Sequence, residues 1–176
     1  APISPYAVSK LAGEAYLKVF HRIYGLETVA LRYFNVFGPF QDPGSPYSAV
    51  IPLFIKALRE GAAPVINGSG EQSRDFTYVA NVVHGNILAA EAPKAAGRVI
   101  NLACRGSITV NRLAREIGRL VGRPEIEPVH REPRPGDVMH SCASISLAEE
   151  ILGYTPIVSF SDGLARTVSW FEGGLG

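Results

Sequence analysis

The chain of 176 residues is long enough for one domain with a sizeable hydrophobic core. Its 17 Lys and Arg residues nearly balance its 16 Asp and Glu residues, so the charge does not support a nucleic-acid or membrane-surface partner. The sequence has no apolar stretch of membrane-spanning length and no signal-peptide pattern, from which we expect a cytoplasmic protein.

A helix is predicted over residues 5–24, because apolar residues recur there at helical spacing between a capping Ser4 and a terminating Gly25. A strand is predicted at residues 28–34. This strand is apolar at nearly every residue, and we therefore expect it to be buried on both faces, as the strands of parallel sheets are. A loop rich in Pro and Gly follows at residues 38–46.

Helices and strands alternate through the rest of the chain, which indicates an α/β fold. The pattern Ser-Leu-Ala-Glu starting at Ser146 predicts a capping box at the start of a late helix. The further predicted elements are, in order, a helix at 49–60, a short strand at 64–66, a turn at 67–68, an extended segment at 75–78, a helix at 79–92, a strand at 99–103, a helix that runs from its cap Thr109 to 121, a strand at 126–131, a rigid loop at 133–137, a short helix from 146 and a last helix at 162–171.

The cysteine and histidine residues predict neither a metal site nor a disulfide. Cys104 and Cys142 lie far apart without a Cys-x-x-Cys spacing, and we expect both to be free, buried thiols. The histidines at 21, 84, 130 and 140 lack metal-ligand spacing and are predicted to be structural or surface residues.

Tyr6 and Lys10 form a Tyr-x-x-x-Lys pattern whose spacing of four places both side chains on one face of the first helix. An ammonium group beside a phenol favours tyrosinate, so Tyr6 is a candidate general acid/base for a substrate hydroxyl or carbonyl. The pattern is weak evidence by itself, because many amphipathic helices present Tyr and Lys at this spacing.

Four segments in order along the chain strengthen this reading. They are PYAVSKLAGE at 5–14, LRYFNVFGP at 31–39, NGSGEQSRDF at 67–76 and RPGD at 134–137. Together they resemble the extended short-chain dehydrogenase/reductases of the NAD-dependent epimerase/dehydratase family. Among that family, the chain looks most similar to the C-terminal part of bacterial UDP-N-acetylglucosamine and UDP-glucose 4-epimerases.

The resemblance implies a catalytic and a cofactor role for three residues. Tyr6 matches the family's catalytic tyrosine and Lys10 the lysine that holds the nicotinamide ribose of NAD. Tyr33 matches a position beside the nicotinamide. The alternative reading of Tyr33, in a buried strand, is core packing.

The resemblance also implies a binding site for a UDP-sugar. Asn35, Arg74 and Arg134 match residues that bind the diphosphate, for which the planar fork of arginine is well suited. The remaining matches are Asp137 near the nucleotide ribose, Ser141 as a small gatekeeper that leaves room for an N-acetyl group, and Ala49, Val50 and Asn67, which frame substrate and base with backbone groups.

Plainer readings of the same residues stay open. Asn35 and Asp137 could be turn residues, and Gly68-x-Gly70 is better read as a turn than as a phosphate loop. Arg74 could form a surface ion pair with its neighbour Asp75, and Arg134 could be a solvated loop charge.

The fold implied is the C-terminal portion of a Rossmann-type extended short-chain dehydrogenase/reductase, with remaining parallel strands and a small α/β substrate-binding domain. Residues 1–38 would be a remnant of the NAD-binding domain, and 39–176 mainly the sugar-nucleotide-binding domain, with 79–103 returning to the Rossmann sheet. The family is often dimeric through the helix with the Tyr/Lys pair, so we expect a homodimer.

The function implied is NAD-dependent 4-epimerisation of UDP-GlcNAc/GalNAc or UDP-Glc/Gal through a 4-keto intermediate. The alternatives are a 4,6-dehydratase or decarboxylase of the same family, or a non-catalytic nucleotide-sugar-binding module. Two departures bear on this: residues 143–148 lack an Asp and a Lys common in the family, and no Gly-x-x-Gly-x-x-Gly motif for NAD is present. We therefore expect a truncated chain that is inactive alone.

Overall fold

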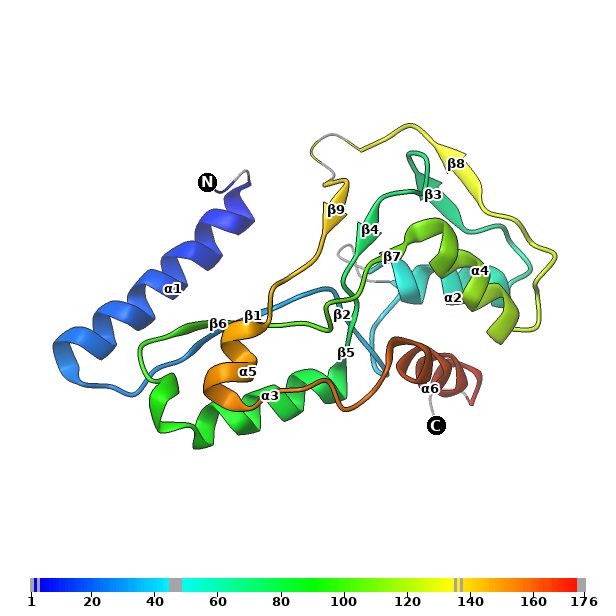
Figure 1. Cartoon of the computed structure of the whole chain (residues 1–176). Helices are drawn as coiled ribbons and strands as arrows, with labels where there is room; N and C mark the ends of the chain where they lie inside the picture. The colour runs from blue at the N-terminus through cyan, green and yellow to red at the C-terminus, as the bar shows by residue number, and fades with distance from the viewer. Residues whose placement is uncertain (1, 3, 45–48, 135, 137, 174–176) are drawn as a thin grey trace.

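The computed structural model describes residues 2, 4–44, 49–134, 136 and 138–173 as a mixed α/β fold with several small sheets (Figure 1). The helices are α1 (Pro5–Tyr24), α2 (Val50–Arg59), α3 (Val79–Glu91), the 3-10 turn η1 (Pro93–Ala95), α4 (Val110–Leu120), α5 (Ser146–Leu152) and α6 (Phe160–Glu172). The strands are β1 (Ala30–Tyr33), β2 (Val36–Phe37), β3 (Val65–Asn67), β4 (Ser73–Arg74), β5 (Thr77–Tyr78), β6 (Val99–Leu102), β7 (Ile108–Thr109), β8 (Val129–Arg131) and β9 (His140–Ser141).

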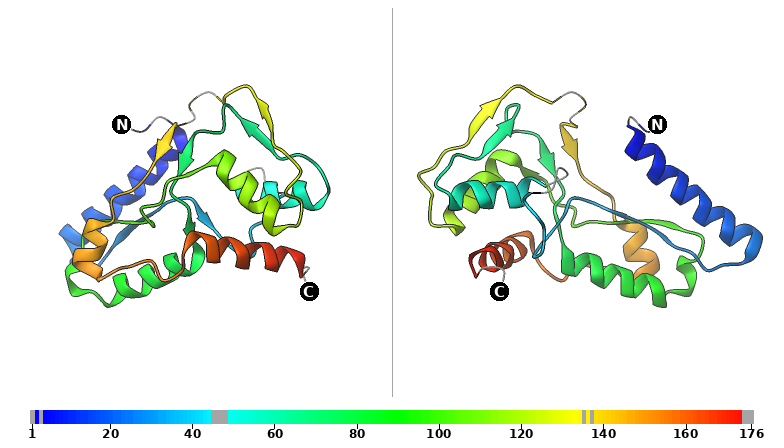
Figure 2. Two further views of the ribbon diagram at one scale, coloured as in Figure 1. Left: turned by 45° about the vertical axis from the view of Figure 1, so that its right-hand side comes forward. Right: turned by 180° about the vertical axis from the view of Figure 1, so that it is seen from behind.

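Helix α1 has the predicted ends and lies at one side of the molecule in every view (Figure 2). Ser4 Oγ accepts from the Ala7 amide at 3.1 Å, and Gly25 ends the helix in the left-handed conformation. No described residue of α1 is buried, although it carries nine exposed large apolar side chains. Its contacts with the following segment include Thr28 Oγ1 donating to the Leu17 carbonyl and an ion pair between Arg32 and Glu14.

Strand β1 pairs in parallel with β6, with Ala30 opposite Val99 and Tyr33 opposite Leu102. The expectation that this segment is buried on both faces is wrong for the described chain. Ala30 is buried, whereas the following three residues are half-buried or exposed. The reason is that β6 is the one described strand that pairs with β1, so the other edge and part of one face are uncovered.

Two hydrophobic clusters make up the core. The first lies between the small sheets and helices α2, α4 and α6, and its largest fully buried members are Phe37, Ile51, Ile55, Leu58, Ile66, Leu113, Ile117 and Leu164. The second packs α3 and α5 against β6, and its largest fully buried members are Tyr154, Ile100, Leu102 and Ile145. Residues 143–154 pack with β6 in the second cluster, so the stretch 39–176 contributes to both clusters. The division into two domains stays a prediction.

Four two-residue strands were not predicted, and three of them form one sheet. This sheet has the order β7-β4-β9, with β4 antiparallel to β7 and parallel to β9. The register places Arg74 opposite Ile108 on one side and Ser141 on the other. The sheet therefore joins two sequence-distant candidate site residues.

Three local predictions are corrected. The strand expected at 126–131 begins only at Val129, because the Ile126 amide turns back to the Arg123 carbonyl at 3.2 Å. The capping box at Ser146 does not form: Ile145 is the N-cap, and Glu149 instead pairs with Arg105. Both cysteines are free as predicted, but Cys104 is half-buried and Cys142 exposed.

The described residues contain no helix long and apolar enough to cross a membrane. Within the same part of the chain, no group of three or more His, Cys, Asp or Glu side chains is placed to bind a metal ion.

Candidate functional site

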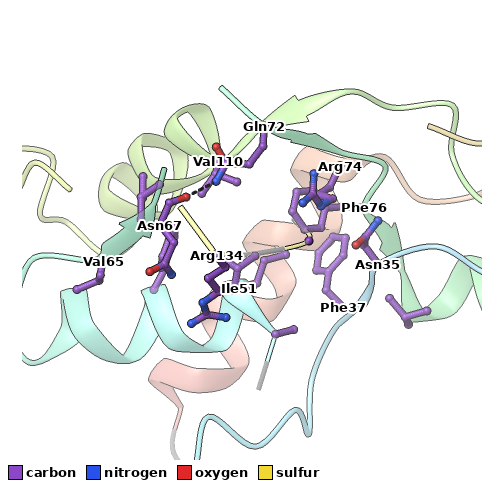
Figure 3. A pocket seen from close by; sticks show the side chains of 16 residues that line it. Asn35, Phe37, Ile51, Val65, Asn67, Gln72, Arg74, Phe76, Val110 and Arg134 are labelled. Carbon is purple, nitrogen blue, oxygen red and sulfur yellow. Dashed lines mark hydrogen bonds between the residues drawn. The ribbon is translucent and has the colours of Figure 1, made fainter. Parts of the chain in front are cut away.

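A pocket of about 400 Å³ opens between α2, the β3 strand and the segments around β2 and β4 (Figure 3). Its floor is apolar and is formed by core side chains such as Phe37, Phe54 and Phe76. Two arginines and three amide side chains are the polar residues of its lining: Arg74, Arg134, Asn35, Asn67 and Gln72. Among the described residues of the lining, two are arginines and none is acidic, so this part of the pocket suits an anionic ligand with an apolar part.

Arg74 reaches the pocket from β4, the central strand of its sheet. Its Nη1 donates to its neighbour's carbonyl, that of Ser73, at 2.9 Å, and lies 3.5 Å from the Met139 carbonyl oxygen. These contacts hold the guanidinium beside β9, where Ser141 is the register partner of Arg74. Arg134 comes from the chain between β8 and β9 and is exposed at the same pocket. In Figure 3, Arg134 lies between Asn67 on one side and Arg74 with Asn35 on the other.

Asn35 occupies the sharp bend between β1 and β2, with a φ of 37° that Asn tolerates better than most residues. Its Nδ2 donates to the Asp75 carbonyl at 3.1 Å, and its own carbonyl accepts from the Thr77 amide at 3.2 Å. An amide nitrogen has two hydrogens, so one donor can serve Asp75 while the other serves a ligand. The turn reading of Asn35 is therefore compatible with a binding role.

Helix α2 starts at the pocket with Ala49 as its N-cap and Val50 as its first residue. Alanine has no side-chain oxygen with which to cap the first amides of a helix. The positive end of the helix dipole thus adds to the charge of the two arginines.

Gln72 is a pocket residue that the sequence analysis did not select. It is only 8% exposed, and its Nε2 donates to the Asn67 carbonyl at 2.6 Å. This bond closes the turn at 67–70 against the pocket. The spacing of two between Gln72 and Arg74 is a signal that could have found it, since alternate residues of an extended segment share a face.

The structure brings six of the predicted site residues to this pocket, and the other predicted residues that it describes lie outside the lining. The six are Asn35, Ala49, Val50, Asn67, Arg74 and Arg134. Ser141 lies next to it on β9, whereas Asp137 falls outside the described residues. Tyr33 is at the end of β1, where its hydroxyl donates to Asn86 Oδ1 at 3.0 Å.

Tyr6 and Lys10 do not line the pocket. They lie one turn apart on α1, with Lys10 Nζ 5.3 Å from the centre of the Tyr6 ring, and the Tyr6 side chain is 70% exposed. In all three ribbon views, the N-terminal end of α1 and strand β9 are at the same end of the molecule (Figures 1 and 2). The Tyr/Lys face is therefore accessible, but the described residues do not enclose it.

The surface ion pair considered for Arg74 and Asp75 is excluded by the position of Asp75. This residue is completely buried, and its carboxyl oxygens accept hydrogen bonds from backbone amides. Arg74 and Asp75 thus face opposite sides of the chain.

The residues that could contact NAD fit one end of that cofactor. Tyr6 with Lys10 presents a phenol and an ammonium on one helix face, a pair that can hydrogen-bond a ribose hydroxyl. Neither these two residues nor Tyr33 lines the pocket described above.

The sequence profile of the NAD dependent epimerase/dehydratase family matches residues 1–103. A putative UDP-glucose 4-epimerase of Methanocaldococcus jannaschii is 36% identical over 171 residues, which are 97% of this chain and 54% of that protein. A UDP-glucose 4-epimerase of Mycolicibacterium smegmatis is 35% identical, with the same coverage. The chain thus spans about half the length of the curated relatives it matches.

Solved structures agree with this similarity. UDP-N-acetylglucosamine 4-epimerase from Methanobrevibacter ruminantium, in complex with UDP-N-acetylmuramic acid, is 48% identical with a TM-score of 0.92, over 98% of this chain and 55% of that one. UDP-glucose 4-epimerase from Thermotoga maritima, with UDP-glucose, is 40% identical with a TM-score of 0.94, over 100% of this chain and 56% of that one. The chain therefore belongs to the NAD dependent epimerase/dehydratase family.

Proposed function

We propose that this chain carries the nucleotide-sugar-binding part of an NAD-dependent UDP-sugar 4-epimerase. The observation that carries the proposal is the pocket, in which Arg74, Arg134 and the start of α2 direct positive charge at one cavity. A diphosphate is the anion that this arrangement suits, because each guanidinium can bind phosphate oxygens in a bidentate way.

The amide side chains and apolar floor supply the complementary contacts. Asn67 and Gln72 offer donors and acceptors on one side of Arg134, where a uracil and its ribose would lie. Asn35 and Arg74 lie on the other side, toward β9 and Ser141. The sugar would then extend from the diphosphate past Ser141 toward the Tyr6 end of α1.

In this proposal Tyr6 acts as the acid/base on a sugar hydroxyl, and Lys10 supports the deprotonated phenol. When bound, NAD supplies the acceptor and donor of hydride, which no side chain can provide. Relatives with bound UDP-glucose and with bound UDP-N-acetylmuramic acid support a UDP-sugar as the ligand class.

Ser141 supports an N-acetylated sugar as the preferred substrate. It is a small, half-buried residue beside Arg74, and it leaves space where a bulky aromatic side chain would not. We therefore propose UDP-N-acetylglucosamine and UDP-N-acetylgalactosamine as the substrate pair. With Ser141→Tyr, affinity for these should fall while affinity for UDP remains; equal affinity for the acetylated sugars would contradict the assignment.

Titration calorimetry of the chain with UDP and UDP-N-acetylglucosamine tests the binding proposal. Both ligands should bind, and Arg134→Ala should weaken both by about ten- to a hundredfold, as expected for one charged hydrogen bond. Arg112→Ala is the matched control, because Arg112 pairs with Glu116 on the exposed face of α4 and not at the pocket. Absence of binding by the unmodified chain would refute the proposal.

A further inference from the structure

Asp75 is a buried carboxyl group to which the proposed function assigns no role. It is 0% exposed and lies directly after Arg74, at the point where β4 leaves its sheet. A buried carboxyl group is unfavourable unless several hydrogen bonds satisfy it, so its partners indicate what it does.

The carboxyl oxygens of Asp75 accept hydrogen bonds from two segments that are distant in sequence. Oδ1 accepts from the backbone amides of Cys104 and Gly106, both at 3.1 Å. Oδ2 accepts from the amide of Ala143 at 3.4 Å and lies 4.0 Å from the Cys142 thiol. One carboxyl group thus ties the chain after β6 to the chain after β9.

The backbone of the same residue holds a third segment. Its carbonyl accepts from Asn35 Nδ2 at 3.1 Å, at the bend between β1 and β2. Asp75 therefore contacts or adjoins three segments of the proposed site: Arg74 precedes it, Asn35 binds its carbonyl, and Ser141 precedes Cys142.

We propose that Asp75 is a positioning residue, which sets the distance between two of the diphosphate-binding residues, Arg74 and Asn35, and the sugar-facing residue Ser141. This inference rests on the proposed function, because it assigns the two ends of the site to two parts of the ligand. In this proposal Asp75 does not contact the substrate itself but positions Arg74, Asn35 and Ser141, which do.

The chemistry of a carboxylate explains why aspartate stands here. Its two oxygens both accept, so it can serve amides on two sides at once. In Asp75→Asn, the one amide oxygen can keep the bonds to Cys104 and Gly106, because the reverse orientation would break two bonds instead of one. The NH2 group would then face the Ala143 amide, donor against donor, and release the β9 side alone.

The test compares two ligands on the unmodified chain and on Asp75→Asn. We expect the Kd for UDP-N-acetylglucosamine to rise roughly tenfold in the variant, because sugar binding must then order the β9 side that the bond to Ala143 holds in the unmodified chain, and the Kd for UDP to rise by less than about twofold. A role in stability alone would weaken both ligands equally or neither, and either result overturns the proposal. Asp162→Asn is the matched control, since Asp162 bonds Ser159 at the exposed start of α6.

Hydrogen exchange provides a readout that does not require ligand binding. In the unmodified chain, the amides of Cys104, Gly106 and Ala143 should all be protected, and in Asp75→Asn only Ala143 should lose protection. An unprotected Ala143 amide in the unmodified chain overturns the proposal even if the variant does not fold. If the chain binds neither nucleotide, the function proposed above fails, while the exchange pattern still decides whether Asp75 holds the β9 side.

Discussion

The pocket region and helix α1 differ sharply in how their apolar residues are used. Around the pocket, α2 buries five of its ten residues and α4 five of its eleven. Helix α1 is the longest described helix, at 20 residues, yet buries none while exposing side chains such as Phe20 and Ile23. The first region is held by its own packing, whereas α1 is held by local caps and a few polar contacts.

This difference shows which part of the described chain is held by packing. The pocket has a continuous core beneath it, so its apolar floor is held by packing among the described residues. Tyr6 and Lys10 stand on a helix whose apolar surface has no counterpart among them. The residues proposed to bind the nucleotide sugar are therefore supported by a packed core. The proposed acid/base pair, Tyr6 and Lys10, is positioned only by its own helix.

The largest expected effect comes from truncating one apolar side chain in each of the two regions and comparing the loss of stability. Ile55→Ala, in the pocket core, should lower the free energy of unfolding by about 2–5 kcal/mol, because Ile55 is fully buried. Leu17→Ala, on α1, should change it by less than about 1 kcal/mol. Chemical denaturation of both variants measures the difference; a comparable loss in Leu17→Ala would show that α1 is packed in solution.

The second prediction compares two glycines in the left-handed conformation. A Cβ on Gly70 would lie 2.0 Å from Asn111 Oδ1, whereas one on Gly25 would meet nothing within 4 Å. Both substitutions to Ala incur the left-handed penalty of about 1–2 kcal/mol. Gly70→Ala should lose roughly a further 1–3 kcal/mol through overpacking. Thermal unfolding of the two variants tests this, and equal losses would contradict the close approach at Gly70.

The third prediction concerns self-association. Exposed apolar residues on α1 should promote it, and Ile23→Glu should weaken it by at least about tenfold in Kd, because burying an aliphatic side chain contributes 1.5–3 kcal/mol. Val129→Glu is the control, since Val129 is similarly exposed on β8 in the pocket region. Sedimentation equilibrium across a concentration series measures both. If Ile23→Glu and Val129→Glu changed the Kd of self-association equally, α1 would not form the interface.

The smallest expected effect concerns the ion pair that tethers α1. The hydrogen bonds from Arg32 lower the pKa of Glu14 below its ordinary value of 4.5. A lowered pKa in the folded state means that the stabilisation is present above 4.5 and is lost as the pH falls through the folded-state value. The stability difference between the chain and Glu14→Gln should therefore be about 0.5 kcal/mol at pH 7 and shrink as the pH falls below 4.5. If the stability difference between the chain and Glu14→Gln stayed constant in acid, the ion pair with Arg32 would not be its cause.

The helices were predictable because their signals are local. Ser4 and Thr109 cap α1 and α4 through their own side chains, as expected from the sequence. The capping box at Ser146 had the same kind of signal and was wrong, because Arg105, distant in sequence, pairs with Glu149. Local patterns thus predict an end correctly unless a distant partner competes for the same side chain.

The short strands and Asp75 could not be predicted for the same physical reason. Strands β4, β7 and β9 have two residues each, and their pairing depends on segments far apart in the chain. Asp75 follows an arginine and so suggested a surface pair, whereas its partners are backbone amides with no sequence signature. The family resemblance, not spacing, gathered the six pocket residues into one predicted site, and their roles stay predictions.

Asn81 has a consequence for how this molecule can move. It is fully buried on α3, where Nδ2 donates to the Val158 carbonyl at 2.8 Å and Oδ1 accepts from the amides of Ile157 and Val158 at 2.8 and 2.9 Å. These bonds join the α3 side of the second cluster to the segment that enters α6 in the first. Since such bonds tolerate little sliding, we expect the two clusters to rotate as one body rather than to slide past each other.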